Sequence, residues 1–179
     1  MQRIGVMGAG AVGCYYGAML ARAGRAVTLI GRPQHVQAIE RSGLRLQTSA
    51  SDETISMRAS TEPSGLRGAE LVLFSVKSSD TEAAGRAMAP YLERGAAIVT
   101  LQNGVDNAER LAATLEREVI PACVYVAVEW RAPARCGITA AASSCSAARR
   151  KARRSPRCFA RRRCRWRFPA TLWVRYGQS

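Results

Sequence analysis

The fold is decided by residues 2–13 of the chain, QRIGVMGAGAVG. Its first half predicts a short buried strand, which runs directly into a glycine-rich turn. An alanine-rich helix over residues 11–23 follows, closed by Gly24, and a second strand is expected over residues 26–30. A strand, a glycine turn, a helix and a strand at this spacing form the βαβ unit that binds dinucleotides.

Three glycines give this turn its chemistry. Gly8 permits the tight turn at the strand end, Gly10 lets the backbone approach a pyrophosphate, and Gly13 lets the helix pack closely on the strand. The free N–H groups and the partial positive charge of the helix N-terminus would then hold the anion. The alternative is a glycine-rich turn that merely joins a strand to a helix.

The end of the second strand predicts which dinucleotide is bound. Units that bind NAD usually carry Asp or Glu here, where it accepts hydrogen bonds from the ribose hydroxyls. This chain has Gly31 followed by Arg32. A carboxylate would repel a 2′-phosphate, whereas a guanidinium can bind one with two hydrogen bonds. The sequence therefore predicts NADPH as the cofactor; the alternative is that Arg32 is a solvated loop residue.

The positive charge of the chain is confined to its last part. Residues 1–130 hold 13 Lys and Arg and 13 Asp and Glu, whereas residues 131–179 hold 14 Lys and Arg and no acid. The first part has the size of one ordinary domain. We therefore expect a dinucleotide-binding domain over residues 1–128 and an arginine-rich tail over residues 129–179.

Targeting segments and metal sites have no support in the sequence. No charged region followed by an apolar run opens the chain, and no apolar run reaches the roughly 18 residues of a membrane span. The six cysteines show no CxxC spacing and His35 is the only histidine, so no metal site is expected. A reduced, cytoplasmic protein fits this composition.

Further strands are predicted along the domain. Apolar runs predict buried parallel strands over residues 71–76 and 96–101 and one more strand, bent or broken near its proline, over residues 118–128. Alternating apolar and polar residues predict a hairpin of exposed or edge strands over residues 43–48 and 54–58.

Helices are predicted between these strands. A short helix is expected over residues 33–42, and capping-box patterns open helices over residues 79–91 and 106–115. Strands and helices therefore alternate, which is typical of an α/β, Rossmann-like doubly wound, mostly parallel sheet.

Two polar residues are expected at the ligand-binding edge of this sheet. Ligands bind beyond the carboxyl ends of such strands, so Lys77 and Asn103, which follow two strands, should face the dinucleotide crevice. Lys77 is the only lysine before Lys151; its ammonium can hold a carboxylate or a carbonyl oxygen and can donate a proton. The Asn103 amide can bind a ribose or substrate hydroxyl. The alternatives are a solvated lysine and an Asn-Gly turn.

Together, the motifs resemble the N-terminal domain of the ketopantoate reductase (2-dehydropantoate 2-reductase) family over roughly residues 1–128. They are GAGAVG at 8–13, GR at 31–32, LFSVK at 73–77 and LQNGV at 101–105. The strand-end lysine followed by LQNG is more specific than the glycine motif. The resemblance implies NADPH-dependent reduction of 2-dehydropantoate to pantoate, a step toward pantothenate and coenzyme A.

The resemblance also implies roles for the site residues. Arg32 would bind the 2′-phosphate, while Lys77 and Asn103 would seat the nicotinamide end and the substrate in supporting catalytic roles. The implied cofactor-binding set is Gly8, Ala9, Gly10, Ala11, Val12, Gly13, Arg32, Lys77 and Asn103. The family's second, all-helical domain supplies a general-acid lysine and a substrate-binding carboxylate. Nothing after Trp130 matches it, so we expect a truncated enzyme or an NADP(H)-binding module without turnover.

Three interpretations apply to the arginine-rich tail. It could be a basic arm that binds nucleic acid nonspecifically, a segment attracted to anionic membranes, or an aberrant, out-of-frame C-terminus. The abrupt loss of acids and the lack of helical or strand periodicity favour the last, and predict that most of the tail is disordered. The expected partner is a small 2-keto acid, with no specific nucleic acid and no membrane.

Overall fold

The computed structural model describes residues 2–47, 51–104, 106–124, 126–132 and 135–140. The strands are β1 (Arg3–Met7), β2 (Ala26–Ile30), β3 (Leu44–Gln47), β4 (Asp52–Ile55), β5 (Arg58–Ser60), β6 (Leu71–Phe74), β7 (Ala97–Thr100), β8 (Ile120–Pro121), β9 (Ala127–Ala132) and β10 (Arg135–Ala140). The α-helices are α1 (Ala11–Arg22), α2 (Pro33–Ser42), α3 (Thr81–Met88) and α4 (Asn107–Leu115), and the 3-10 turns are η1 (Pro63–Leu66), η2 (Ser78–Asp80) and η3 (Ala89–Tyr91).

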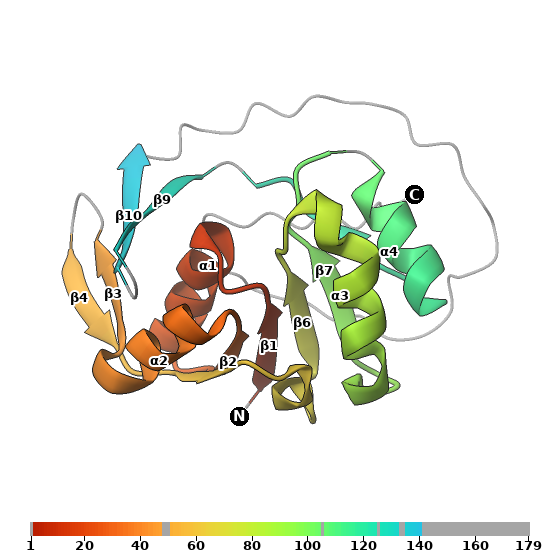
Figure 1. Cartoon of the computed structure of the whole chain (residues 1–179), viewed down its shortest axis with the longest axis horizontal. Coiled ribbons are helices and arrows are strands. Elements are labelled where there is room, and N and C mark those ends of the chain that lie inside the picture. The colour runs from red at the N-terminus through yellow and green to blue at the C-terminus, as the bar shows by residue number, and fades with distance from the viewer. Residues whose placement is uncertain (1, 48–50, 105, 125, 133–134, 141–179) are drawn as a thin grey trace.

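Six strands form the main sheet in the order β5-β2-β1-β6-β7-β8, and all five pairings are parallel. Val6 of β1 lies opposite Leu29 of β2 and Leu73 of β6. The chain fills one side of β1 first and then crosses to the other side with β6 (Figure 1). The carboxyl ends of β1 and β6 therefore meet at the topological switch point, where such sheets bind their ligands.

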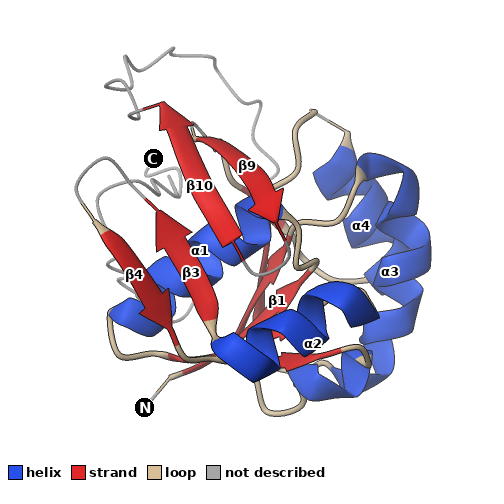
Figure 2. Ribbon diagram, turned by 60° about the vertical axis from the view of Figure 1, so that its left-hand side comes forward, coloured by secondary structure: helices blue, strands red, loops and turns tan. Residues whose placement is uncertain are grey.

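Helix α1 lies between two sheets, which explains its composition. It contacts β1 and β2 of the main sheet on one side and β3, β4, β9 and β10 on the other (Figure 2). Seven of its twelve residues are buried, from Gly13 to Ala18 and at Leu20. A helix covered on two sides needs small and apolar residues all round instead of one apolar stripe.

The opposite face of the main sheet is covered by α3, α4 and η1. Successive residues of β6 enter different cores: Leu71 and Leu73 join the α1 side, whereas Val72 and Phe74 join the α3 and α4 side. A strand buried on both faces reads as a continuous apolar run in the sequence. The predicted doubly wound, mostly parallel sheet is therefore confirmed.

A second sheet, in the order β4-β3-β10-β9, stands beside α1 (Figure 2). The predicted hairpin is present as the antiparallel pair β3 and β4. The edge of β3 is not free, however, because β10 pairs with it in parallel and β9 pairs with β10. Arg58, predicted to end the hairpin, instead belongs to β5 at the edge of the main sheet.

The strand predicted over residues 118–128 is two separate strands. β8 covers only Ile120 and Pro121, pairs with β7, and is the edge of the main sheet, where a residue without an N–H is tolerated. β9 crosses position 128 and β10 reaches Ala140, so regular structure continues beyond the expected end of the domain. Residues 141–179, which carry most of the predicted disordered tail, lie outside the described residues.

Helices α3 and α4 begin close to their predicted positions, but their capping boxes do not form. Asp80 and Asp106 occupy the N-cap positions without a side-chain capping hydrogen bond. Asp80 instead accepts a hydrogen bond from the Ser79 hydroxyl at 2.9 Å, and η2 leads into α3. The capping pattern thus predicts where each helix begins, but not the side-chain hydrogen bonds at its N-terminus.

Candidate functional site at the carboxyl edge of the main sheet

The turn after β1 requires glycine at position 8. Gly8 has a φ of +112°, and a Cβ there would lie 2.8 Å from backbone atoms of Ser75 and Val76. Other residues are excluded by the conformation and by the close approach of the loop after β6. The predicted turn-forming role of Gly8 is confirmed.

Hydrogen bonds tie this turn to its neighbours on both sides. The N–H groups of Gly8 and Ala9 both donate to the carbonyl of Ile30, at 3.0 and 2.8 Å. The Ser75 hydroxyl donates to the Gly8 carbonyl at 2.8 Å. The turn is therefore fixed between the end of β2 and the loop that follows β6.

The N-terminus of α1 is open at Gly10. Gly10 is the exposed N-cap, and no atom of the described residues, apart from its own chain neighbours and its helix, lies within 4 Å of the place its Cβ would occupy. Ala11 and Val12, which follow it, are half-buried, and the first turn carries no acidic residue. Gly13 faces inward, where a Cβ would collide with the Gly8 carbonyl. An anion beside Gly10 would meet the positive end of the helix, where the described residues place neither a side chain at Gly10 nor an acidic residue in the first turn.

Arg32 lies at the end of β2, two residues beyond the carbonyl that holds the turn. Its backbone is the N-cap of α2, with carbonyl bonds from the N–H groups of His35 and Val36. Its side chain is exposed, and within the described part of the chain its guanidinium makes no hydrogen bond or ion pair. His35 is half-buried beside it; burial lowers the pKa of His35, and the charge of Arg32 lowers it further. Near neutral pH the positive charge here is therefore that of Arg32.

Lys77 and Asn103 are both exposed beyond the carboxyl ends of neighbouring strands, Lys77 after β6 and Asn103 after β7. Ser75, two residues before Lys77, binds the glycine turn through its hydroxyl, and its N–H donates to the Met7 carbonyl at 2.8 Å. The loop that carries Lys77 therefore lies directly beside the glycine turn.

A buried amide that the sequence analysis did not single out joins the two loops. Gln102 is 9% exposed, and its side-chain NH₂ donates to the Val76 carbonyl at 3.1 Å and to the Thr81 hydroxyl at 2.8 Å. Its side-chain oxygen accepts a hydrogen bond from the Thr100 hydroxyl at 3.0 Å. Gln102 therefore connects the end of β7 to the loop that carries Lys77.

Asn107 makes a second connection from the start of α4. It is 2% exposed, and its side-chain NH₂ donates to the Ser78 hydroxyl at 3.0 Å and to the Asn103 carbonyl. Ser78 directly follows Lys77 in the chain, and the second partner is the backbone carbonyl of Asn103. The backbone on which these two candidate side chains stand is therefore fixed by buried hydrogen bonds.

The sequence contained a signal for both connecting residues. Gln102 directly continues an apolar run that predicts a buried strand, and Asn107 lies four residues before Leu111, on the buried face of its helix. A polar side chain in either place needs hydrogen-bond partners.

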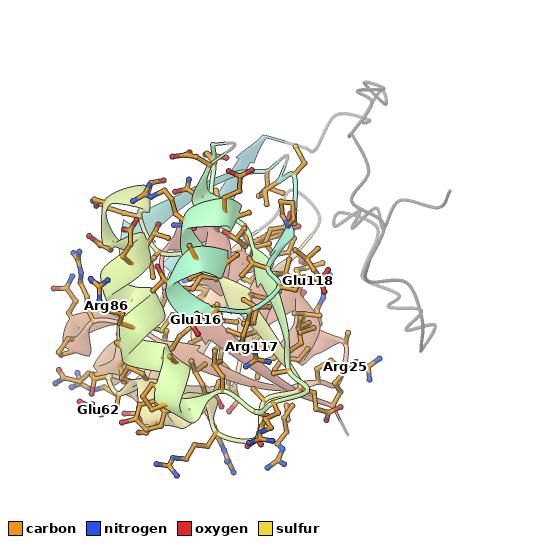
Figure 3. All side chains as sticks on the ribbon, turned by 90° about the vertical axis from the view of Figure 1, so that its right-hand side faces the viewer. Arg25, Glu62, Arg86, Glu116, Arg117 and Glu118 are labelled. Carbon is orange, nitrogen blue, oxygen red and sulfur yellow. The ribbon has the colours of Figure 1, made fainter. Side chains whose placement is uncertain are left out.

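Other parts of the described structure offer less for a ligand. A cavity of about 290 Å³ is lined by Arg94, Arg117 and Glu118 at the amino ends of β7 and β8, away from the glycine turn. The Arg117 guanidinium (Figure 3) already donates to the carbonyls of Glu93, Arg94 and Ala96, each at 3.0 Å. Among the described residues there is no group of three metal-ligating side chains. The described helices are also too short or too polar to cross a bilayer.

The carboxyl edge of the main sheet thus has the features of a dinucleotide site. An open helix N-terminus lies beside the end of β2, which leads into the exposed Arg32, and the two suit two phosphate groups. An exposed ammonium and an exposed amide follow the next two strands, where a ligand carboxylate, carbonyl or hydroxyl could be held.

The chain matches a family model described as ketopantoate reductase PanE/ApbA over residues 4–144. This match extends past residue 128, the predicted end of the domain. A 2-dehydropantoate 2-reductase of Halobacterium salinarum is 38% identical over 112 residues, which are 62% of this chain and 37% of that protein. A glycerol-3-phosphate dehydrogenase [NAD(P)+] of Rhizobium johnstonii is 35% identical over 124 residues, 66% of this chain and 38% of that protein.

Solved structures show the same similarity. The crystal structure of a PanE/ApbA family ketopantoate reductase from Ralstonia eutropha JMP134 superposes with a TM-score of 0.76 and 55% identity, covering 78% of this chain and 47% of that one. The chain therefore spans less than half the length of these relatives.

Proposed function

Because the chain belongs to the ketopantoate reductase PanE/ApbA family, we propose that it binds NADPH at the carboxyl edge of its main sheet and serves the reduction of 2-dehydropantoate to pantoate. The observation that carries the proposal is the open N-terminus of α1 at Gly10, together with the exposed Arg32 that follows the strand end to which the glycine turn is bonded. This pairing fits a dinucleotide that carries a pyrophosphate and a separate 2′-phosphate.

The residues of the glycine turn fit such a ligand. Gly8 and Gly13 bring the turn and the helix together so closely that no Cβ could be added, whereas Gly10 leaves open space. Ala9, Ala11 and Val12 contribute backbone around that space. In the proposed complex the pyrophosphate lies against the start of α1, and Arg32 holds the 2′-phosphate.

Lys77 and Asn103 act at the other end of the ligand. NADPH supplies a hydride to the keto carbon when it is bound. Lys77 holds the carboxylate or the keto oxygen of the substrate and stabilises the negative charge that develops on that oxygen. Asn103 orients a ribose or substrate hydroxyl through its amide. A step toward pantothenate and a cytoplasmic location belong to the same proposal.

A titration of the full chain with NADPH, followed by the fluorescence of the nicotinamide, tests the binding. We expect saturable binding that is tighter for NADPH than for NADH. Absence of saturable binding would contradict the proposal.

The absorbance of NADPH in the presence of 2-dehydropantoate then tests turnover. Consumption that depends on the keto acid supports the reductase. Saturable binding without consumption supports the second candidate, an NADP(H)-binding module. That candidate is kept because the chain spans 37% to 47% of the two family relatives above.

A further inference from the structure

Gly31, at the end of β2, is glycine because of its neighbour and not because of its backbone. It is not among the glycines with positive φ, so an L-residue could adopt its conformation. A Cβ at position 31 would, however, lie 2.5 Å from the Cβ of Ala9 and 3.5 Å from its Cα. The 3.5 Å distance is an ordinary van der Waals contact, but Cβ atoms of two separate residues do not approach to 2.5 Å.

The collision cannot be relieved by a small shift of either segment. Ala9 is 5% exposed, and its N–H is bound to the carbonyl of Ile30 at 2.8 Å. The N–H of Gly31 is bound to the Ser60 carbonyl of β5 at 3.0 Å. The turn and the strand end are thus held together by bonds on both sides of the contact.

This contact limits which side chain could stand at the end of β2. A carboxylate that accepts hydrogen bonds from the adenosine ribose requires a side chain at the end of this strand. The methyl group of Ala9 occupies the space that the Cβ of such a side chain at position 31 would need. Recognition of the adenosine ribose or its 2′-phosphate would then depend on the next residue, Arg32, whose side chain is exposed.

We propose that Ala9 and Gly31 are a specificity-determining pair, in which the methyl group of Ala9 excludes a ribose-binding carboxylate and leaves the choice of dinucleotide to Arg32. This inference rests on the proposed function, because it concerns the NADPH site. It assigns the preference to the packing of the glycine turn on β2 as well as to the charge of Arg32.

Four proteins test the pair: the full wild-type chain, Gly31→Asp, Ala9→Gly and the double variant Ala9→Gly/Gly31→Asp. Their dissociation constants for NADPH and NADH are measured by nicotinamide fluorescence, and their midpoints of thermal unfolding are measured alongside. Gly31→Asp should lower the unfolding midpoint and weaken both ligands. The double variant should recover the midpoint and bind NADH. Its NADPH-to-NADH preference should shift by about 100-fold, because the new carboxylate accepts a charge-assisted hydrogen bond from the ribose and repels the 2′-phosphate.

The control is the double variant Ala9→Gly/Gly31→Asn, which relieves the same contact without adding charge. It should recover the midpoint but show a smaller shift in preference than the aspartate variant. The inference is overturned if Gly31→Asp alone keeps the wild-type midpoint and binds NADH, or if the aspartate double variant binds NADH no better than Gly31→Asp. A wild-type chain that binds neither dinucleotide overturns the proposed function and this inference with it.

Discussion

Arg32 uses its backbone to begin α2 and leaves its side chain exposed, so the guanidinium can be removed without changing the packing of the fold. We predict that Arg32→Ala raises the dissociation constant of NADPH by about 10- to 100-fold, the range for loss of one charge-assisted hydrogen bond, and leaves that of NADH unchanged. Fluorescence titration with both dinucleotides measures this.

The matched control is Arg41→Ala, because Arg41 is an exposed arginine in the last turn of the same helix. It should leave both constants unchanged. If Arg32→Ala kept the full preference for NADPH, the 2′-phosphate would be held by another group.

Gln102 differs from Arg32 because its side chain is buried and its amide donates two hydrogen bonds and accepts one. Gln102→Leu would leave the Val76 carbonyl and the Thr81 hydroxyl without the NH₂ group they now share. We predict that it lowers the free energy of unfolding by about 1–3 kcal/mol, the range for a buried polar group left unpaired, as measured by urea denaturation. Gln37→Leu, at an exposed position of α2, should change it far less; equal effects would argue against the buried connection.

At the scale of elements, two glycines at the start of α1 should have different roles: Gly13 in the stability of the fold and Gly10 in ligand binding. A methyl group at Gly10 would meet open space, whereas one at Gly13 would collide with the Gly8 carbonyl. We predict that Gly10→Ala keeps the wild-type unfolding midpoint and weakens NADPH binding, because its Cβ stands where the pyrophosphate approaches. Gly13→Ala should lower the midpoint by several degrees, as expected for a loss of about 1–3 kcal/mol from overpacking. Calorimetry and titration of both variants check this; equally tight binding by Gly10→Ala would contradict the site.

An ion pair joins α3 to α4 next to the loop of Lys77. The Arg110 guanidinium donates two hydrogen bonds to the Glu82 carboxylate, at 2.7 and 2.9 Å, and one to the Ser78 carbonyl at 3.1 Å. These bonds from Arg110 lower the pKa of Glu82. A carboxyl with a lowered folded-state pKa stabilises the protein above its unfolded-state pKa, and this contribution is lost as the pH falls through the folded-state value.

We therefore predict that Glu82→Gln is less stable than the wild type at neutral pH, that the difference begins to shrink as the pH falls below the ordinary glutamate value of about 4.3, and that it disappears once the pH has fallen through the lowered folded-state pKa of Glu82. Urea denaturation over this pH range measures it. Glu40→Gln, at an exposed position of α2, should show no such pH-dependent difference. A difference that stayed constant with pH would rule out the ion pair as its cause.

The sequence predicts those elements that are marked by a local pattern, such as an apolar run, a glycine turn or a helix-capping residue. The apolar run of β6, the glycine turn and the starts of the helices are all of this kind. The missed elements depend on contacts between distant segments: β5 is three residues long and is defined by its pairing with β2, and β10 is a strand because it lies beside β3. The site followed the same rule. The strand-end positions of Lys77 and Asn103 could be predicted, but the partners of Gln102 become visible only when two loops are brought together.

At the scale of the whole molecule, the described chain is two sheets that share one helix. The main sheet carries the candidate site, and the second sheet covers the far side of α1 (Figure 2). Leu44 and Leu46 of β3 are fully buried in the core that includes α1, and β10 pairs along the same strand. The residues after 128 therefore support the helix whose N-terminus forms the proposed binding site.

This arrangement predicts different stabilities for two shortened chains. A chain ending after Ala140 keeps β9 and β10, whereas a chain ending after Val126 loses both and leaves β3 without its parallel partner. We expect the shorter chain to lose about 2–4 kcal/mol of unfolding free energy, the effect of exposing one or two core side chains. Urea denaturation of both chains measures the difference. NADPH titration should show weaker binding by the shorter chain, because α1 then loses the part of its cover that β9 and β10 provide. If both chains unfolded at the same urea concentration with the same slope, β9 and β10 would not support α1, and the domain would end near residue 128, as the sequence predicts.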